Sequence, residues 1–491
     1  MTTGDVELTI LDNGAGTVTV PASTVQVVMG CCSGGTVGSV VATVDPGNLF
    51  GIVGAGPGTE LAALSASVGG TVLFVKTESV NAGSNSAVVH TSLGTCTISV
   101  TGEPLDAYMV RLRVVTAGTV GTDGIRFRLS VDAGRNEGRI ISLGTSVTYV
   151  IAGTGLTLNF GAGTLLLGGT AKFYCTPPTT DVASIISCLT ALDASPYSMS
   201  GWGSIVLAGE MDADDADTVQ TKLATMADGK TYTRAIISTR DAAVPTAWGG
   251  AGETEQAWID AITLDVSALD ADRVSMSAGH YNIPSIFPIV ACGLPRYRRP
   301  GAWAYAARQV TIAPQRHAGA VVDKGLAQIV VNPSTDPNDG FVYHDERTSP
   351  SLDTARFTSY RTRKGKTGFF VVNPKLMSAP GSVFSMLPIG NVMDIGCDIV
   401  QQTGELYINS DVALNNNGTI EEKAAQAIEL ANRKALRNNM VAKKLISSFS
   451  YTIDRTNNVR ETSEVNFSCT LFGVGYILQI NGTIGFGTEG A

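Results

Sequence analysis

The sequence has little charge and few aromatic residues. Asp, Glu, Lys and Arg make up 16% of its 491 residues, and Phe, Trp and Tyr make up 7%. Soluble domains usually carry about 25% charged residues, so we expect much of this surface to be buried against other subunits. The net charge of −9 argues against nucleic acid as a partner, because binding to phosphates needs a positive field.

The sequence also lacks a long apolar run. A helix that crosses a bilayer needs about 20 apolar residues, whereas the longest candidate, residues 283–294, is short and holds two prolines. We therefore expect no membrane insertion. Asp5 and Glu7 stand where a secretory signal would have basic residues ahead of an apolar stretch, so we expect no such signal.

Redox, metal-binding and catalytic motifs are missing as well. The eight cysteines include no CxxC spacing, which favours buried reduced thiols over a disulfide framework. None of the four histidines is spaced as a metal-binding pair, and neither HExxH nor GxSxG occurs. His344, Asp345 and Glu346 come nearest to a catalytic or metal-binding trio, but neighbouring residues on an extended segment point to opposite faces.

An acidic stretch at residues 210–217 resembles a calcium-binding loop only superficially, since it lacks the central Gly and the closing Glu. The favoured interpretation places these carboxylates at the start of a helix, where the helix dipole stabilises negative charge. We therefore expect no catalytic, cofactor-binding or metal site, and we expect that the protein is not an enzyme.

The composition and the hydrophobic pattern of the sequence change along the chain, which predicts several domains. Residues 82–178 are rich in Thr, Gly and Val with regular turn signals, which predicts an inserted antiparallel β sandwich or barrel. Residues 179–345 alternate strand and helix patterns, which favours a mixed α/β domain. The other segments are predicted to be an N-terminal arm, the first part of the core, a C-terminal core domain and a C-terminal arm, at residues 1–24, 25–81, 346–475 and 476–491. The predicted fold class is multi-domain α+β with extended arms at both ends.

A long helix is predicted at residues 419–447. Thr419 and Glu422 form a capping-box pattern at its start, and an apolar face lies beside a basic one. The basic face is either an ordinary solvated surface or a surface that docks on an acidic partner. The two chain ends are likewise either frayed or add strands to a neighbour's sheet.

Several residue runs together resemble phage contractile tail sheath proteins. In the first part of the chain these are residues 25–30, 45–47, 56–64 and 69–76. Later ones are residues 356–358, Gly365, residues 368–373 and residues 392–394. The end of the chain adds residues 418–420, the long helix, an alternating strand at 448–455, Asn458, Val459 and Thr462, and a tail at 475–485.

The resemblance implies a tail-sheath-like core and a non-enzymatic virion subunit without cofactors. Such subunits stack in rings or a helix around a tail tube and contract to drive the tube through the host cell envelope. The implied partners are other copies of the chain, the tube protein, and baseplate and tail terminator proteins. The implied location is the virion tail, after assembly in the host cytoplasm.

The resemblance also assigns roles to residues. The tube-facing candidates lie on the basic helix face: Lys423, Arg433, Lys434, Arg437 and Lys444. The candidates for strands exchanged between neighbouring subunits lie in the two arms: Val6, Leu8, Ile10, Val18, Val20, Tyr476, Leu478, Ile480, Ile484 and Phe486.

Other functions remain open from the sequence. The sheath could belong to a bacteriocin or injection machine, and the chain could be a non-contractile virion subunit such as a tube, capsid or adhesin protein. The α/β section argues against a tube protein, which is typically short and dominated by β structure. The missing nucleophile and base argue against an enzyme on an α/β scaffold.

Overall fold

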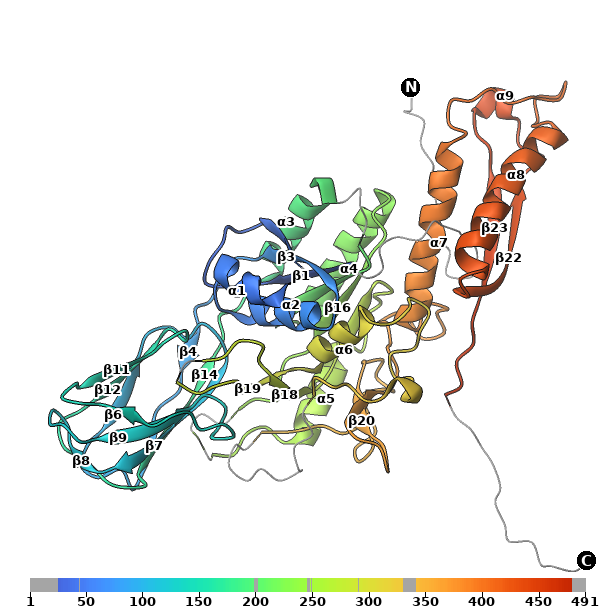
Figure 1. Ribbon diagram of the computed structural model, residues 1–491. Helices are drawn as coiled ribbons and strands as arrows, with labels where there is room; N and C mark the ends of the chain where they lie inside the picture. Colours follow the sequence, from blue (N-terminus) through green and yellow to red (C-terminus); the bar gives the residue numbers. More distant parts are fainter. Residues whose placement is uncertain are drawn as a thin grey trace, which may run out of the picture.

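The computed structural model describes residues 25–43, 45–197, 202–244, 248, 250–289, 291–329 and 341–478. It is a mixed α/β fold with several separate sheets. Figure 1 shows three parts in a row, with a β domain at one end, an α/β part in the centre and a helical C-terminal unit at the other end.

The central part is built on a six-stranded sheet in the order β17-β16-β15-β1-β3-β2. The first five strands run parallel, and β2 pairs antiparallel with β3. The inner strands are almost entirely buried, as expected for parallel strands covered on both faces. The strands are β1 (Val25–Gly30), β2 (Val40–Thr43), β3 (Thr71–Lys76), β15 (Ser204–Glu210), β16 (Arg234–Ser238) and β17 (Val274–Ser277).

Helices cover both faces of this sheet. One apolar core joins the sheet to α3 (Val182–Asp193), α4 (Ala213–Asp228) and α5 (Glu255–Asp265). A second core on the other face joins it to α1 (Pro46–Val53), α2 (Pro57–Ser67) and α6 (Gly301–Gln309). Two hairpins complete the centre, namely β18 (His280–Pro284) with β19 (Arg296–Pro300) and β20 (Tyr360–Thr362) with β21 (Phe369–Val371).

Gly58, in the first turn of α2, allows close packing of this helix on β1. A Cβ on Gly58 would lie 2.7 Å from the backbone carbon of Gly30, so the start of α2 can approach the end of β1 only with glycine there.

The β domain has two larger antiparallel sheets and a small two-stranded one, β13-β8. One contains β10-β9-β7-β14-β4, with β5 also pairing with β14, and the other contains β11-β12-β6. Alternate residues of both sheets fill one shared core. The strands are β4 (Ser84–Asn85), β5 (Val89–Thr91), β6 (Ile98–Thr101), β7 (Tyr108–Thr116), β8 (Gly118–Thr119), β9 (Arg126–Ser130), β10 (Ile141–Ser142), β11 (Thr148–Ile151), β12 (Leu156–Phe160), β13 (Thr164–Leu165) and β14 (Thr170–Thr176).

The C-terminal unit packs two helices on a two-stranded antiparallel sheet around its own apolar core. Its elements are α7 (Leu387–Glu405), α8 (Glu422–Leu436), a π-helical turn (Arg437–Val441), β22 (Ile446–Ile453), α9 (Val459–Thr462) and β23 (Phe467–Gly473).

The predicted helix at residues 419–447 is wrong at both ends. The Thr419 hydroxyl bonds Asn417 and Asn415 instead of capping the helix, and α8 begins at Glu422. At the other end, Lys444 takes a left-handed φ of 58° and β22 starts at Ile446. Burial of Leu445 and Ile446 in the core explains why the chain turns there.

The sequence patterns did not predict the α7 helix. Its 19 residues include Pro388 and three glycines, which are poor helix formers. Ten of its residues are buried, so tertiary packing outweighs the low helix propensity.

Candidate assembly surfaces

The β22–β23 sheet has two different faces. Tyr451, Ile453 and Cys469 point into the core under α7 and α8. The opposite face presents the short polar side chains of Ser448, Ser450, Thr452, Ser468 and Thr470, together with Phe472, which is 51% exposed. This alternation follows from the two-residue period of a strand.

One edge of β22 is held by side chains from α8. Arg433 donates from Nε and Nη2 to the carbonyl of Tyr451 at 3.0 and 2.7 Å. The amide of Ile453 donates to Glu429 at 2.8 Å, and Arg455 donates to the same carboxylate oxygen at 2.8 Å. Burial tends to raise the pKa of Glu429, but these contacts outweigh it and the pKa is lowered. Arg433 therefore binds the edge of β22, while its side chain remains 45% exposed.

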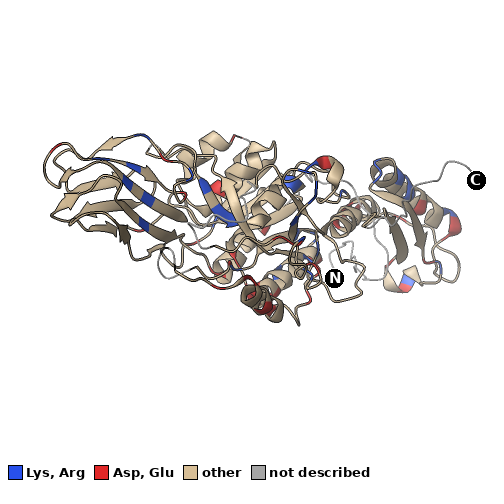
Figure 2. Ribbon diagram, turned by 90° about the horizontal axis from the view of Figure 1, so that it is seen from below, with Lys and Arg blue, Asp and Glu red and all other residues tan. Residues whose placement is uncertain are grey.

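The remaining cations of α8 and its π-helical turn lie on the outward face. Lys423, Lys434 and Arg437 are exposed, and among the described residues none of them has an ion-pair partner. Figure 2 shows Lys and Arg positions along the C-terminal helix. Lys444 is exposed too, but it lies in the turn before β22 and not on the helix.

Leu430 was missed as a candidate. Its side chain is 69% exposed and lies between the outward cations, because residues 423, 427, 430, 434 and 437 follow the helical spacing of one face. That spacing was visible in the sequence. The outward face of α8, defined as Lys423, Leu430, Lys434 and Arg437, thus has an apolar centre and a cationic rim.

The strand-exchange candidates are mostly beyond the described residues. Val6, Leu8, Ile10, Val18, Val20, Ile480, Ile484 and Phe486 lie outside that part of the chain. The Tyr476 hydroxyl donates to the carbonyl of Gln315 at 2.8 Å, and its ring lies 5.5 Å from that of His317. Leu478 is 62% exposed.

A buried ion cluster joins α7 to the central sheet. Arg234 donates to both oxygens of Asp394 at 2.7 and 3.0 Å, and Arg273 donates to Asp394 at 3.2 Å. Burial tends to lower the pKa of Arg273, but Asp394 outweighs it and the pKa is raised. A Cβ on Gly390 would lie 2.3 Å from Nε of Arg234, so α7 is seated against the guanidinium.

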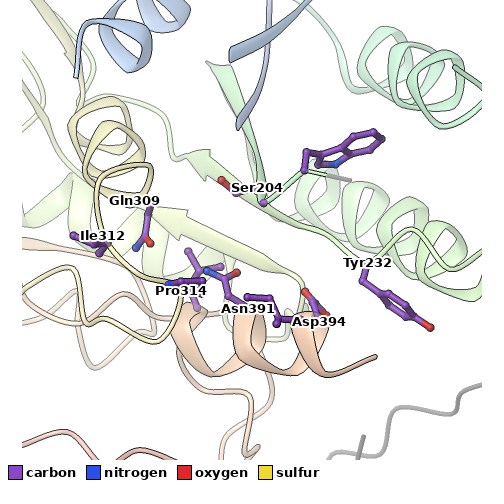
Figure 3. Close-up of a pocket in the computed structure, with 11 residues that line it drawn as sticks. Ser204, Tyr232, Gln309, Ile312, Pro314, Asn391 and Asp394 are labelled. Atoms are coloured by element: carbon purple, nitrogen blue, oxygen red, sulfur yellow. The ribbon is translucent and has the colours of Figure 1, made fainter. Parts of the chain in front are cut away.

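A small pocket lies beside this cluster. Ser204, Gln309, Asn391 and Asp394 are among the residues around it (Figure 3). Its volume of about 30 Å³ holds at most a few water molecules, so it is part of the joint between α7 and the core and not a substrate site.

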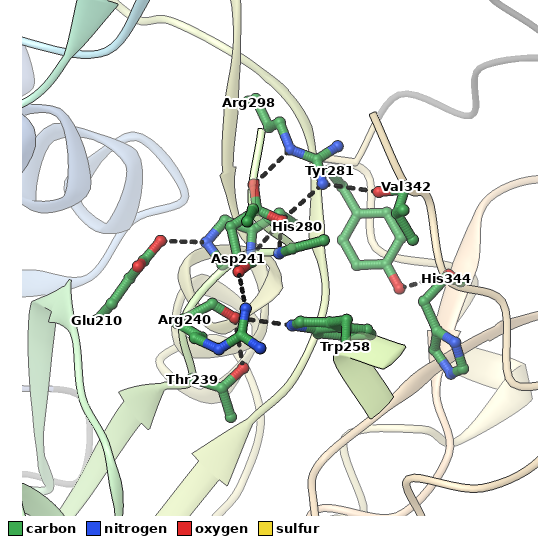
Figure 4. A network of polar contacts seen from close by, with 12 residues as sticks. Glu210, Thr239, Arg240, Asp241, Trp258, His280, Tyr281, Arg298, Val342 and His344 are labelled. Carbon is green, nitrogen blue, oxygen red and sulfur yellow. Dashed lines mark hydrogen bonds and ion pairs between the residues drawn. The ribbon is translucent and has the colours of Figure 1, made fainter. Parts of the chain in front are cut away.

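A larger cavity of about 650 Å³ lies at the carboxyl ends of the parallel strands, next to the β domain. Cavities of this size and position often bind small molecules. His280 lies 3.2 Å from Glu210 and 3.6 Å from Asp241, and Arg298 donates to Asp241 at 2.6 Å (Figure 4).

Charged groups around this cavity lie close to one another, but neither ring nitrogen of His280 makes a hydrogen bond among the described residues. Burial tends to raise the pKa of Asp241, but Arg298 and His280 outweigh it and the pKa is lowered. Cys31 also lines the cavity, where burial raises the pKa of its thiol to about 12. A thiol with that pKa stays protonated at neutral pH and is a poor nucleophile. Cys31 is therefore not an activated nucleophile.

Comparison with known proteins identifies the family of the chain. A family model described as DUF2586, N-terminal domain, matches residues 3–374. The chain belongs to the DUF2586 family. A search among curated proteins finds no match to it.

Solved sheath tail proteins resemble the DUF2586 chain over almost its full length. The sheath tail protein from Desulfitobacterium hafniense is 11% identical with a TM-score of 0.45, covering 96% of this chain and 100% of its own. The helical sheath of the anti-feeding prophage, in its contracted state, is 8% identical with a TM-score of 0.49, covering 99% and 98%. The sheath tail protein from Listeria innocua is 11% identical with a TM-score of 0.43, covering 94% and 96%.

The histidine trio is split in the DUF2586 chain. His344 contacts Glu255 through Nδ1 and Glu346 through Nε2, both at 2.8 Å. Asp345 faces the other way and accepts hydrogen bonds from Thr362 at 3.0 and 2.5 Å, as the two-residue period requires. The carboxylates of Glu255 and Glu346 hold the imidazole ring of His344, so these contacts join α5 to the segment around residue 344.

Metal and membrane features are absent from the part of the DUF2586 chain that the structure describes. Within these residues no cluster of three or more His, Cys, Asp or Glu side chains could hold a metal ion. None of the helices described is both long and apolar enough to span a bilayer.

Proposed function

We propose that the chain is the structural subunit of a contractile tail sheath. Copies stack in rings or a helix around a tail tube, and contraction drives the tube through the host cell envelope. The observation that carries the proposal is the outward face of α8, where Lys423, Lys434 and Arg437 surround the exposed Leu430. An apolar centre with a polar rim is the usual anatomy of a protein interface.

Strand exchange is proposed to hold the copies together. The β22–β23 sheet contributes two strands from the described residues, and so short a sheet gains stability when further strands join it. Arms from neighbouring subunits would supply those strands through main-chain hydrogen bonds. A contact of this kind that repeats without closing builds a filament from one type of subunit.

The joint between α7 and the core fits a mechanical role. Arg234, Asp394 and Arg273 form a buried cluster with two guanidinium groups on one carboxylate, which fixes the C-terminal unit to the central sheet. A displacement of the C-terminal unit would therefore move the core with it. No catalytic step is part of this proposal.

The proposed setting is the tail of a virion or a related bacteriocin or injection machine. The proposed partners are other copies of the chain, the tube protein, and baseplate and tail terminator proteins. Assembly would take place in the host cytoplasm.

Electron microscopy of the purified full-length protein tests the proposal. Hollow striated cylinders are expected. Narrow smooth tubes would instead indicate a tube protein, and dispersed monomers would overturn the sheath assignment.

The tube contact is tested by reversing two charges on the outward face of α8. The K434E/R437E variant should load less on the tube while it still assembles with itself, because both side chains are exposed and hold no partner among the described residues. The matched control is K364E/K366E, which reverses two exposed charges in the β20–β21 turn. Equal tube loading by K434E/R437E and wild type would make this face an ordinary solvated surface.

Strand exchange is tested by removing residues 1–20. The shortened chain should remain a folded, soluble monomer and should fail to polymerise, since main-chain pairing with the neighbour is lost. Cylinders of normal length from this variant would contradict the exchange.

A further inference from the structure

The β domain carries positive charge in a chain that is negative overall. Residues 82–178 contain seven Lys and Arg against five Asp and Glu, whereas the whole chain has a net charge of −9. Five of these cations form the basic sheet face, which is the outer side of three neighbouring strands: Arg111 and Arg113 on β7, Arg126 and Arg128 on β9, and Lys172 on β14. Figure 2 shows several Lys and Arg positions in blue on the strands of the β domain.

The register places like charges directly opposite each other. Arg113 is paired with Arg128 across β7 and β9, and Arg111 is paired with Lys172 across β7 and β14. Such pairs destabilise a sheet when nothing neutralises them. Repulsion is visible in Lys172, whose pKa is lowered first by partial burial and then by Arg111.

One carboxylate lies among these cations in the described structure. Glu137 accepts a hydrogen bond from Nε of Arg113 at 2.8 Å. Its pKa is lowered mainly by that bond, and Arg111 and Arg128 contribute as well. The Nε of Arg111 is buried with no hydrogen-bond partner among the described residues. The basic sheet face therefore keeps an excess of positive charge that an external anion would neutralise.

A matching negative surface lies elsewhere on the same chain. Residues 210–217 contain five carboxylates and no Lys or Arg. The acidic start of α4, defined as Asp212, Asp214, Asp217 and Asp265, is exposed, and Asp265 accepts a hydrogen bond from the amide of Ala213 at 2.9 Å. Burial raises the pKa of Asp215, and repulsion from Asp212 and Asp214 adds to the rise.

We propose that the basic sheet face of one copy docks on the acidic start of α4 of a second copy. The two surfaces lie on different parts of the molecule, the β domain and the helical layer of the central sheet (Figure 1). A contact between two different surfaces of identical chains is heterologous and repeats from copy to copy. The complementary charge would steer the copies and set their register. This inference depends on the proposed function in one respect: it takes a second copy of the chain as the partner that binds the basic sheet face.

The test uses two full-length charge-reversal variants, R126E/R128E and D214K/D217K. Glu at position 128 would face Arg113 but would also lie near Glu137 and would lose the hydrogen bond from Arg128 to the carbonyl of Gly138, so thermal unfolding checks that R126E/R128E is folded. We expect each variant alone to need roughly tenfold more protein to assemble, measured by sedimentation velocity at low salt. An equimolar mixture should recover assembly, because each reversed surface meets its reversed complement. K364E/K366E is the matched control and should assemble as wild type does.

Several results would overturn the contact. Cylinders of normal length from R126E/R128E would refute it while leaving the sheath proposal standing, whereas wild-type protein that stays monomeric would overturn both. A mixture that fails to recover assembly would also refute it. If R126E/R128E lost binding to heparin without any change in assembly, an anionic polymer and not a second copy would be the occupant.

Discussion

Replacing Asp394 with Asn should loosen the joint between α7 and the core. The Asp394 side chain is 9% exposed and neutralises Arg234 and Arg273, whose side chains are 0% and 5% exposed. The substitution keeps the size and one acceptor but removes the carboxylate that both buried guanidinium groups share, and leaves Arg273 with the nearby charge of Asp272. Breaking a buried ion pair in this way costs about 3–5 kcal/mol. Because the amide oxygen of Asn still accepts a hydrogen bond, we expect the lower end, about 3 kcal/mol.

Hydrogen exchange of the α7 amides measures this loss locally. Each 1.4 kcal/mol corresponds to a factor of ten, so the exchange of protected α7 amides should speed up roughly a hundredfold. A local measurement is preferable because a chain of several parts need not unfold in one step. Amides of the β domain should exchange as in wild type, since none of its residues contacts Asp394.

Asp398 provides a matched control on the same helix. Burial and the nearby Asp394 raise its pKa to about 7, and no cation pairs with it among the described residues. D398N removes a charge that is costly to bury, so α7 should exchange at the wild-type rate or more slowly. If D394N behaved like D398N, the ion cluster would not be what fixes α7 to the sheet.

Three further predictions concern other parts of the chain. Burial tends to lower the pKa of His344, but contacts with Glu346 and Glu255 outweigh it and the pKa is raised, so the contribution of His344 to stability is full below about pH 6.5 and is lost as the pH rises through the pKa of the folded state. The thermal midpoint of the wild-type protein should therefore fall above neutral pH. An identical fall in H344Q would contradict this. The eight thiols are buried, and burial raises the pKa of Cys292 to about 12. A thiol reagent should therefore label none of them quickly in the folded protein and all eight after denaturation. Rapid labelling of the folded protein would refute this reasoning. R433A should destabilise β22 by about 1–3 kcal/mol, because the Tyr451 carbonyl loses the hydrogen bonds from Arg433. The control K434A should change stability by less than about 0.5 kcal/mol. Equal hydrogen exchange of the β22 amides in both variants would count against the role of Arg433.

The α7 helix shows where sequence patterns fall short. Pro388 and the glycines argue against a helix locally, and only the burial of ten residues against the core and β23 makes it stable. The end of α8 is a similar case. Its amphipathic pattern continues past residue 441, but the need to bury Leu445 and Ile446 turns the chain into β22.

The contacts of individual cations could be identified only from the tertiary structure. Arg433 and Lys434 are neighbours on a basic helix, and both were expected to face a tube. Arg433 donates to the carbonyl of Tyr451, which is 18 residues away in the chain, whereas Lys434 has no ion-pair partner among the described residues. Such a contact depends on how a helix and a strand pack together, which no local pattern encodes.

The sequence by itself determined the features that depend on local periodicity and composition: the turn-rich β segment, the alternation of strands and helices after it, the buried cysteines and the basic face of α8. Tertiary structure alone decided which charges neutralise one another, since Asp394 meets Arg234 and Arg273, and Glu137 meets Arg113, only after distant or looped segments fold together. The reason is physical. Periodicity acts between residues a few positions apart, whereas desolvation and ion pairing depend on the neighbours that the whole fold brings within a few ångströms.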